Sequence, residues 1–336
     1  MNKYFLQILA CFCLVQFHAF AQLAPVYTAE KFFYIDRFGN WPWKLEATKG
    51  QPFCGNLARI KKGKWGYINS MGKIVIDTKF GNAEDFQEGL ARARSEKTGE
   101  WGFIDSTANW VVNPAFEDAE DFSEGYAAVR KNKKWGYVDK QGKLVVDFTF
   151  EIAHNFQEGL ASVRQDGDWF FINAGGQHII QLSEEYDYAY DFSNGLARVR
   201  KETGNDYTQP RWGFINKSGN ILPTPIYMHL TDFSDGLAAV YQGGYWNYID
   251  TTGQTKIKLP LDDAEKFAQG YARVKVKGLW GFISQDGTYK VQPKFEDAEN
   301  FSSGLAAVKS KGLWGYIDLQ GNWVIAPKYT KAGYFK

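Results

Sequence analysis

The sequence has little net charge and few cysteines. Its 39 Lys and Arg residues are almost matched by 38 Asp and Glu residues. The chain therefore offers neither a basic surface for nucleic acid nor an acidic surface that gathers cations. Cys11 and Cys13 lie in an N-terminal segment that we expect to be removed, which leaves Cys54 alone. One cysteine cannot form an internal disulfide, so the core must stabilise the fold, and we expect Cys54 to be a small, partly buried filler.

The sequence also lacks the motifs of catalysis and metal binding. It contains no Gly-x-Ser-x-Gly, P-loop or His-Glu-x-x-His motif. His154, His178 and His229 do not share the spacing of zinc ligands, so we expect isolated surface or turn histidines. Acidic turns recur without the spacing of a calcium-binding loop, at 117–121, 262–265 and 296–299. We therefore predict a protein without metal, cofactor or enzymatic activity, although a carboxylate pair assembled from distant turns would leave no motif.

The first 21 residues are predicted to be a secretory signal peptide. Lys3 is their only Lys, Arg, Asp or Glu, an apolar run occupies 4–20, and Ala-Phe-Ala at 19–21 fits a signal-peptidase site. The alternatives are a single membrane anchor and a lipoprotein attached through Cys11. Polar residues interrupt the apolar run, and the stretch before Cys11 is short, so we favour neither. We expect an exported mature chain, 22–336, without a transmembrane segment, in the periplasm or at the cell surface.

Tryptophan recurs along the rest of the chain with a nearly fixed period. Successive members of the series are 36, 34, 34, 43, 34, 34 and 34 residues apart, and six of the eight precede a glycine. The series is Trp65, Trp101, Trp135, Trp169, Trp212, Trp246, Trp280 and Trp314. Such a period is typical of tandem repeats, so we interpret these tryptophans as structural. We predict one array of about nine units over 22–336, of which the first is degenerate and partial.

A repeat phenylalanine, which begins the pattern Phe-x-x-Gly-[Leu/Tyr]-Ala, accompanies the tryptophans. It lies 21 residues after most of them, and the series is Phe86, Phe122, Phe156, Phe192, Phe233, Phe267 and Phe301. Phe335 lies at the same distance from Trp314. The chain therefore begins inside one repeat and reaches a repeat position at its other end.

Each repeat contains three short apolar segments, which in the unit at 116–150 are 126–130, 135–139 and 143–146. These segments are rich in β-branched and aromatic residues, and no window shows the apolar period of a helix. An Asp or Asn three positions before a Gly, as in Asp139–Gly142, predicts a tight hairpin between the second and third segments. Ala108 takes the place of this glycine in one unit, so its turn should be weaker.

The second segment indicates a sheet that is covered on both faces. In Trp135-Gly136-Tyr137-Val138 neither alternating set of side chains is polar. We therefore expect an all-β stack of three-stranded meander units that forms an open superhelix, with each Trp-Gly glycine admitting a bulky neighbour. A closed β-propeller is the alternative. Thirty-four residues are few for a four-stranded blade of roughly 40–45 residues, and the two ends do not obviously complete one blade.

These motifs resemble those of the bacterial WG-repeat, or KWG-repeat, proteins. The matching patterns are Lys-Trp-Gly-Tyr-Ile-[Asp/Asn]-x-x-Gly, as at 64–72, and Phe-x-x-Gly-[Leu/Tyr]-Ala-x-Val, as at 122–129. Trp169-Phe170 and Trp246-Asn247 depart from the first pattern because they lose the glycine. The resemblance implies a repetitive, β-rich interaction module with no established chemistry, and no functional site carries over from it.

The period is longest between Trp169 and Trp212, where two residues are added before Phe192 and seven lengthen the next hairpin. Insertions in repeat proteins are commonly surface loops, and clustered tyrosines suit a recognition surface. Neutral variation of a tolerant loop is the alternative. We hypothesise that the 202–209 insertion is functional and that three tyrosines contribute to a ligand surface: Tyr188, Tyr190 and Tyr207.

These observations predict a non-catalytic binding or scaffold module for a protein partner in the cell envelope, because repeat arrays present long concave surfaces. The first alternative is binding of an envelope glycan. It requires exposed aromatic rings, whereas the alternation places them in a core. The second alternative is an enzyme whose site is not visible in the sequence.

Overall fold

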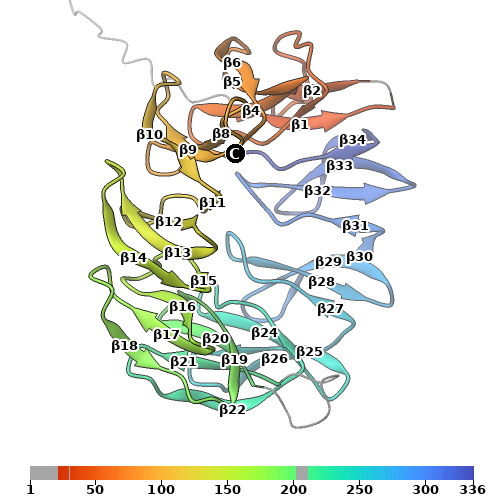
Figure 1. Cartoon of the computed structure of the whole chain (residues 1–336). Coiled ribbons are helices and arrows are strands. Elements are labelled where there is room, and N and C mark those ends of the chain that lie inside the picture. The colour runs from red at the N-terminus through yellow and green to blue at the C-terminus, as the bar shows by residue number, and fades with distance from the viewer. Residues whose placement is uncertain (1–21, 30, 202–210) are drawn as a thin grey trace, which may run out of the picture.

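The chain forms a ring of nine small antiparallel β-sheets in the part that the structure, a computed structural model, describes: residues 22–336 without Glu30 and 202–210 (Figure 1). We number the sheets as blades 1–9. Blades 1–8 each contain four strands in chain order, which we name a to d from the centre of the ring to its rim. The fold is therefore a closed nine-bladed β-propeller, and the prediction of an open superhelix is wrong.

The strands of blades 1–4 are, blade by blade, β3 (Lys49–Gly50), β4 (Leu57–Lys62), β5 (Lys64–Asn69) and β6 (Ile74–Phe80); β7 (Asn82–Ala83), β8 (Ala91–Arg94), β9 (Trp101–Ile104) and β10 (Trp110–Phe116); β11 (Asp118–Ala119), β12 (Tyr126–Lys131), β13 (Lys134–Asp139) and β14 (Leu144–Phe150); and β15 (Ile152–Ala153), β16 (Ala161–Gln165), β17 (Asp168–Ile172) and β18 (His178–Gln181).

The strands of blades 5–8 are β19 (Tyr186–Ser193), β20 (Leu196–Lys201), β21 (Arg211–Asn216) and β22 (Ile221–Tyr227); β23 (His229–Leu230), β24 (Leu237–Gln242), β25 (Tyr245–Asp250) and β26 (Thr255–Leu261); β27 (Asp263–Ala264), β28 (Tyr271–Val276), β29 (Leu279–Ser284) and β30 (Tyr289–Phe295); and β31 (Asp297–Ala298), β32 (Leu305–Ser310), β33 (Leu313–Asp318) and β34 (Trp323–Tyr329). Blade 9 combines β35 (Lys331–Ala332), β1 (Ala24–Tyr27) and β2 (Phe32–Ile35).

Strand a explains why three-stranded units were predicted wrongly. In blade 3 this strand is only the pair Asp118-Ala119, which lies opposite Arg130 and Val129 of strand b. Two residues cannot display an alternating pattern, so sequence periodicity does not detect them. Because strand a is so short, four strands fit within a repeat of 34 residues. The length of the repeat is therefore no argument against a propeller.

Both ends of the chain build blade 9. Val26 of β1 lies opposite Ala332 of β35, and Tyr27 lies opposite Lys331, in an antiparallel pair. Leu-Ala-x-Val at 23–26 repeats the pattern of strand b in the other blades. The C-terminal segment supplies strand a and the N-terminal segment supplies strands b and c, so the two ends complete one blade, contrary to the expectation.

The Trp-Gly glycine lets strand d of the same blade approach strand c. A Cβ atom on Gly136 would lie 2.6 Å from the carbonyl oxygen of Val146 in β14. The register of β13 and β14 shifts at this point, so β14 bulges toward the glycine. The neighbour that the glycine admits is therefore the blade's own backbone. In blade 4, Phe170 replaces the glycine, and it pairs with Gln181 without a register shift between Phe170 and Phe171.

The predicted hairpin turns between strands c and d form. The N–H of Gly142 donates to the carbonyl of Asp139 at 2.9 Å, and Gly142 has a φ of 77°. Ala108 closes the corresponding turn on Asp105 at 2.9 Å with a φ of 67°. This alanine occupies the left-handed region, which is unfavourable for a residue with a Cβ atom.

The hydrophobic core lies between successive blades. One cluster combines Phe103 and Phe116 of blade 2 with Phe122 and Val129 of blade 3. Of the eight period tryptophans, Trp169 and Trp280 are buried and the other six are half-buried. None of the described residues belongs to a helix long and apolar enough to cross a membrane.

Candidate functional site

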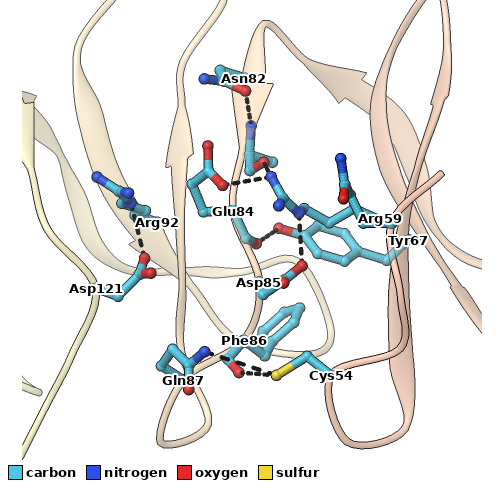
Figure 2. A network of polar contacts seen from close by, with 12 residues as sticks. Cys54, Arg59, Tyr67, Asn82, Glu84, Asp85, Phe86, Gln87, Arg92 and Asp121 are labelled. Atoms are coloured by element: carbon cyan, nitrogen blue, oxygen red, sulfur yellow. Dashed lines mark hydrogen bonds and ion pairs between the residues drawn. The ribbon is translucent and has the colours of Figure 1, made fainter. Parts of the chain in front are cut away.

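An arginine clasp joins blade 1 to blade 2. Nε of Arg59, on strand b, lies 2.7 Å from Oδ1 of Asp85, and its Nη1 lies 2.5 Å from Oε2 of Glu84 (Figure 2). The guanidinium also donates to the carbonyl of Ala83 at 2.6 Å. Its carbon lies 5.5 Å from the ring centre of Trp65 in its own blade. The arginine of one blade thus binds the acidic residue that precedes the repeat phenylalanine of the next blade.

The arginine clasp recurs at two more blade junctions. Nε of Arg92 in blade 2 lies 2.8 Å from Oδ1 of Asp121 in blade 3. Arg198 of blade 5 donates to both carboxylate oxygens of Asp232 in blade 6. A looser form joins blade 7 to blade 8, where Nη1 of Arg273 lies 3.9 Å from the Glu299 carboxylate.

Where strand b lacks the arginine, the next blade usually lacks the matching Asp as well. The pairs of residues at these two positions are Pro25 and Pro52, Ala128 and Asn155, Ala239 and Lys266, and Ala307 and Tyr334. At the third of these junctions a nearby carboxylate, Glu265, lies 3.3 Å from Arg273 of its own blade. Glu265 is therefore matched by an arginine of its own blade, although Ala239 takes the place of the clasp arginine.

The junction of blades 4 and 5 is the exception. Ser162 takes the place of the clasp arginine, yet Asp191 is retained on β19. The hydroxyl of Ser162 donates to Oδ1 of Asp191 at 3.5 Å, and Nδ1 of His154 lies 2.8 Å from the same hydroxyl. Burial, together with the carboxylate of Asp232, raises the pKa of Asp191 to about 7. Burial lowers the pKa of His154, so this imidazole is a poor cation for Asp191 at neutral pH.

Two of the three predicted site tyrosines lie at this exceptional junction. Tyr188 and Tyr190 belong to β19, which has eight residues where strand a has two in the other blades of the ring. Both rings are half-buried. The ring centre of Tyr188 lies 4.8 Å from that of Trp169, and Tyr190 lies 5.7 Å from Trp212. The tyrosines therefore link the tryptophans of blades 4 and 5, whereas Tyr207 lies outside the described residues.

A pocket of about 220 Å³ opens beside Asp191. Its lining residues are Gln157, Tyr190, Asp191, Phe192, Ser193, Arg198 and Asp232. The guanidinium carbon of Arg198 lies 3.9 Å from the ring centre of Tyr190. Arg198 forms its ion pair with Asp232, while Asp191 beside it accepts from Ser162, so the pocket has the chemistry to accept a further cation or hydrogen-bond donor. Sequence reasoning missed Ser162, Asp191 and Arg198, although comparing each strand b position with the residue before the next repeat phenylalanine would have found them.

The residues that border both departures from the period lie next to one another in blade 5. Lys201 and Arg211, which flank the 202–209 insertion, pair with each other at the ends of β20 and β21. The ammonium of Lys201 forms an ion pair with Glu185, within the lengthened connection that precedes β19. An open groove of about 770 Å³ lies there, lined by Asp168 and residues 181–185. The insertion itself lies outside the described residues.

Cys54 has a structural role. Its thiol donates to the carbonyl of Phe86 in the next blade at 3.3 Å (Figure 2). The hydroxyl of Ser123 makes the equivalent bond to the carbonyl of Phe156 at 2.7 Å. Cys54 is half-buried and takes the place of a serine that joins adjacent blades.

The histidines lie in different settings. The ring of His178 stacks on Phe170 at 4.0 Å, and that of His229 stacks on Trp246 at 6.3 Å, whereas His154 belongs to the junction of blades 4 and 5. Within the described part of the chain, no three His, Cys, Asp or Glu residues form a group that could hold a metal ion.

Comparisons with known proteins agree with the repeat and with the fold. The family described as "WG containing repeat" matches residues 65–97, 101–135, 135–169, 169–202, 212–246, 248–280, 280–314 and 314–336. The comparison with curated proteins gives no match. A crystal structure of a eukaryotic initiation factor aligns with 93% of this chain and 98% of its own, with a TM-score of 0.68 and 9% identity. At that identity the likeness concerns the fold alone.

Two further solved structures are less similar. Hsv2p of Kluyveromyces lactis aligns with 82% of this chain and 93% of its own, with a TM-score of 0.37 and 11% identity. The Pan2 WD40 domain of Neurospora crassa aligns with 68% of this chain and 85% of its own, with a TM-score of 0.37 and 12% identity.

Proposed function

The chain belongs to the WG-repeat family, and from that premise we propose that it is a non-catalytic binding module for a protein partner. A closed propeller offers a rigid ring whose loops can vary without disturbing the core. Protein recognition is a common use of such repeat scaffolds. The fold alone does not choose a partner, so the proposal depends on where this chain departs from its own repeat.

One observation carries the proposal, namely that the departures gather in blades 4 and 5. The lengthened connection around Glu185, the root of the 202–209 insertion and the incomplete clasp at Asp191 all lie there. The other repeats keep nearly the same spacing. Because the core needs only the regular repeat, a concentration of irregular features in one sector favours a binding surface over random variation.

We further propose that the mature protein begins at Gln22 and acts in the cell envelope. The apolar run at 4–20 and the Ala-Phe-Ala pattern at 19–21 support export. N-terminal sequencing of the protein from its native cells tests this proposal directly. A chain that retains residues 1–21, or an acylated Cys11, would contradict it.

The glycan alternative has less support. Stacking on sugars requires exposed rings, whereas all eight period tryptophans are buried or half-buried. Trp41 and Trp323, outside that series, are 60% and 42% exposed. We therefore expect acrylamide to quench only a minority of the tryptophan fluorescence. Strong quenching of most of the tryptophan emission would favour the glycan alternative.

The decisive experiment compares capture by three proteins. The immobilised mature chain, a variant that lacks 202–209, and a control with the 95–100 hairpin of blade 2 shortened to two residues are incubated with cell-envelope extract. We expect the wild type and the control to retain a specific protein that the 202–209 deletion loses. Thermal melts verify that both variants fold. Equal capture by all three proteins would exclude the insertion from the binding surface.

A further inference from the structure

We propose that the pocket beside Asp191 binds an arginine side chain of the protein partner, which supplies in trans the guanidinium that strand b of blade 4 lacks. This inference rests on the proposed function, since it assigns chemistry to one part of the binding surface. Lysine would bind the same carboxylate more weakly, because only the guanidinium offers the planar, paired donors that match a carboxylate.

The comparison among blade junctions supports this assignment. Asp85, Asp121 and Asp232 occupy the position of Asp191 and each binds an arginine from the preceding blade. Where the arginine is lost elsewhere in the ring, the Asp at this position is lost as well. Only at Ser162 is the arginine absent while the Asp is retained, among the described residues. The carboxylate is therefore kept without the internal partner that it has elsewhere.

The charges around Asp191 favour an incoming cation. The carboxylates of Asp232 and Glu120 both act on Asp191 unfavourably, and Arg198 opposes them. Arg198 already forms an ion pair with Asp232. Nδ1 of His154 lies 4.0 Å from Oδ1 of Asp191, but burial disfavours the charged imidazole. A second guanidinium would balance the charge of Asp191, which Arg198 offsets only in part.

The packing determines the side from which the ligand enters. In the clasps of blades 1 and 2 the arginine lies over the tryptophan of its own blade, as Arg59 does over Trp65. In blade 4 that place beside Trp169 is taken by Tyr188 and His154, at ring distances of 4.8 and 5.7 Å. An arginine from the partner therefore approaches Asp191 through the pocket next to Tyr190. Tyr190, one of the predicted site tyrosines, would then line the path of the arginine.

The test uses N-acetyl-arginine amide as the probe and its uncharged citrulline analogue as the ligand control. Saturation-transfer NMR on the mature chain at pH 8 measures the binding of each compound. We expect weak but specific binding of the arginine probe, with an affinity reduced by about ten-fold for citrulline and for Asp191→Asn. Asp121→Asn is the matched protein control, because Arg92 already occupies that clasp. It should bind the probe as the wild type does.

The outcomes separate this inference from the proposed function. Equal binding of the arginine probe by wild type and Asp191→Asn, or equal binding of arginine and citrulline, would overturn the inference. If Asp191→Asn also leaves partner capture unchanged while the 202–209 deletion abolishes it, the arginine pocket fails and the proposed function stands. If the arginine probe binds through Asp191 while none of the capture experiments retains a protein, the pocket stands and the proposed function fails.

Discussion

The backbone carbonyl of Tyr27 accepts two hydrogen bonds from Thr330, one from its N–H at 2.8 Å and one from its hydroxyl at 3.1 Å. This contact joins the two ends of the described chain within blade 9. In an open array the first and last units would each expose one apolar face, whereas closure covers both. The stability of the whole ring should therefore depend on side chains near the C-terminus.

Substitution of Phe335 tests this dependence. The ring of Phe335 is fully buried and lies 4.9 Å from that of Tyr316, and its carbonyl accepts a bond from Ser302 at 2.6 Å. We expect Phe335→Ala to lower the free energy of unfolding by about 3–5 kcal/mol in denaturant titrations. Tyr334→Ala, at a site that is 41% exposed, is the control and should change it by less than about 0.5 kcal/mol. A loss of less than about 0.5 kcal/mol for Phe335→Ala would show that closure contributes little.

The arginine clasp should contribute measurably to the docking of blades. The side chains of Arg59 and Asp85 are only 13% and 28% exposed, so solvent screens their interaction weakly. We expect a double-mutant cycle with Arg59→Met and Asp85→Asn to give a coupling free energy of about 1–3 kcal/mol. The exposed pair Lys62 and Glu46 is the control, for which we expect less than about 0.5 kcal/mol. Equal coupling in the two cycles would contradict a special role for the clasp.

The turn at Ala108 stores backbone strain that a glycine would release. We expect Ala108→Gly to raise the free energy of unfolding by about 0.5–1 kcal/mol, because the φ of 67° is unfavourable for alanine. Gly219→Ala is the reverse substitution at the equivalent position, where the added Cβ atom meets only a side-chain carbon at 3.6 Å. It should lower stability by about 1 kcal/mol. Changes of the same sign in the two variants would exclude backbone strain as the cause.

The features that could be predicted from sequence are those repeated locally. The spacing from Asp139 to Gly142 specifies a hairpin because both residues act within that turn. Strand a could not be predicted, because two residues such as Asp118 and Ala119 carry no period. Closure was missed because the parts of blade 9 lie at opposite ends of the sequence. The sequence nevertheless contains a sign of closure, since Leu-Ala-x-Val at 23–26 would continue the repeat that reaches Phe335.

The candidate site divides in the same way. Tyr188 and Tyr190 were found because they lie where the period lengthens, which is visible along the chain. Ser162 and Asp191 were missed because each is an ordinary residue within its own repeat. Their importance depends on contact between neighbouring blades, 3.5 Å across the junction, and becomes visible only when corresponding positions are compared in pairs.

The pH dependence of stability should reveal the unmatched carboxylate. The pKa of Asp191 in the folded protein is about 7, above its ordinary value of 3.8. Between these two pH values the carboxyl is protonated in the folded state and ionised in the unfolded state. The resulting stabilisation is complete below pH 3.8 and is lost as the pH rises through 7. Relative to Asp191→Asn, the wild type should lose about 1–2 kcal/mol between pH 4 and pH 8, a value reduced for partial exposure of the side chain.

Asp286 is the control with the opposite sign. Hydrogen bonds with Ser284 and Thr288 lower the pKa of Asp286 to about 2, so its stabilisation should be lost as the pH falls. Denaturant titrations of the wild type and Asp191→Asn from pH 4 to pH 8 measure the effect of Asp191. Titrations of the wild type and Asp286→Asn below pH 4 measure the effect of Asp286. A pH-independent difference between wild type and Asp191→Asn would show that Asp191 has no elevated pKa in the folded protein, and a difference of the opposite sign would indicate a cationic partner within the chain.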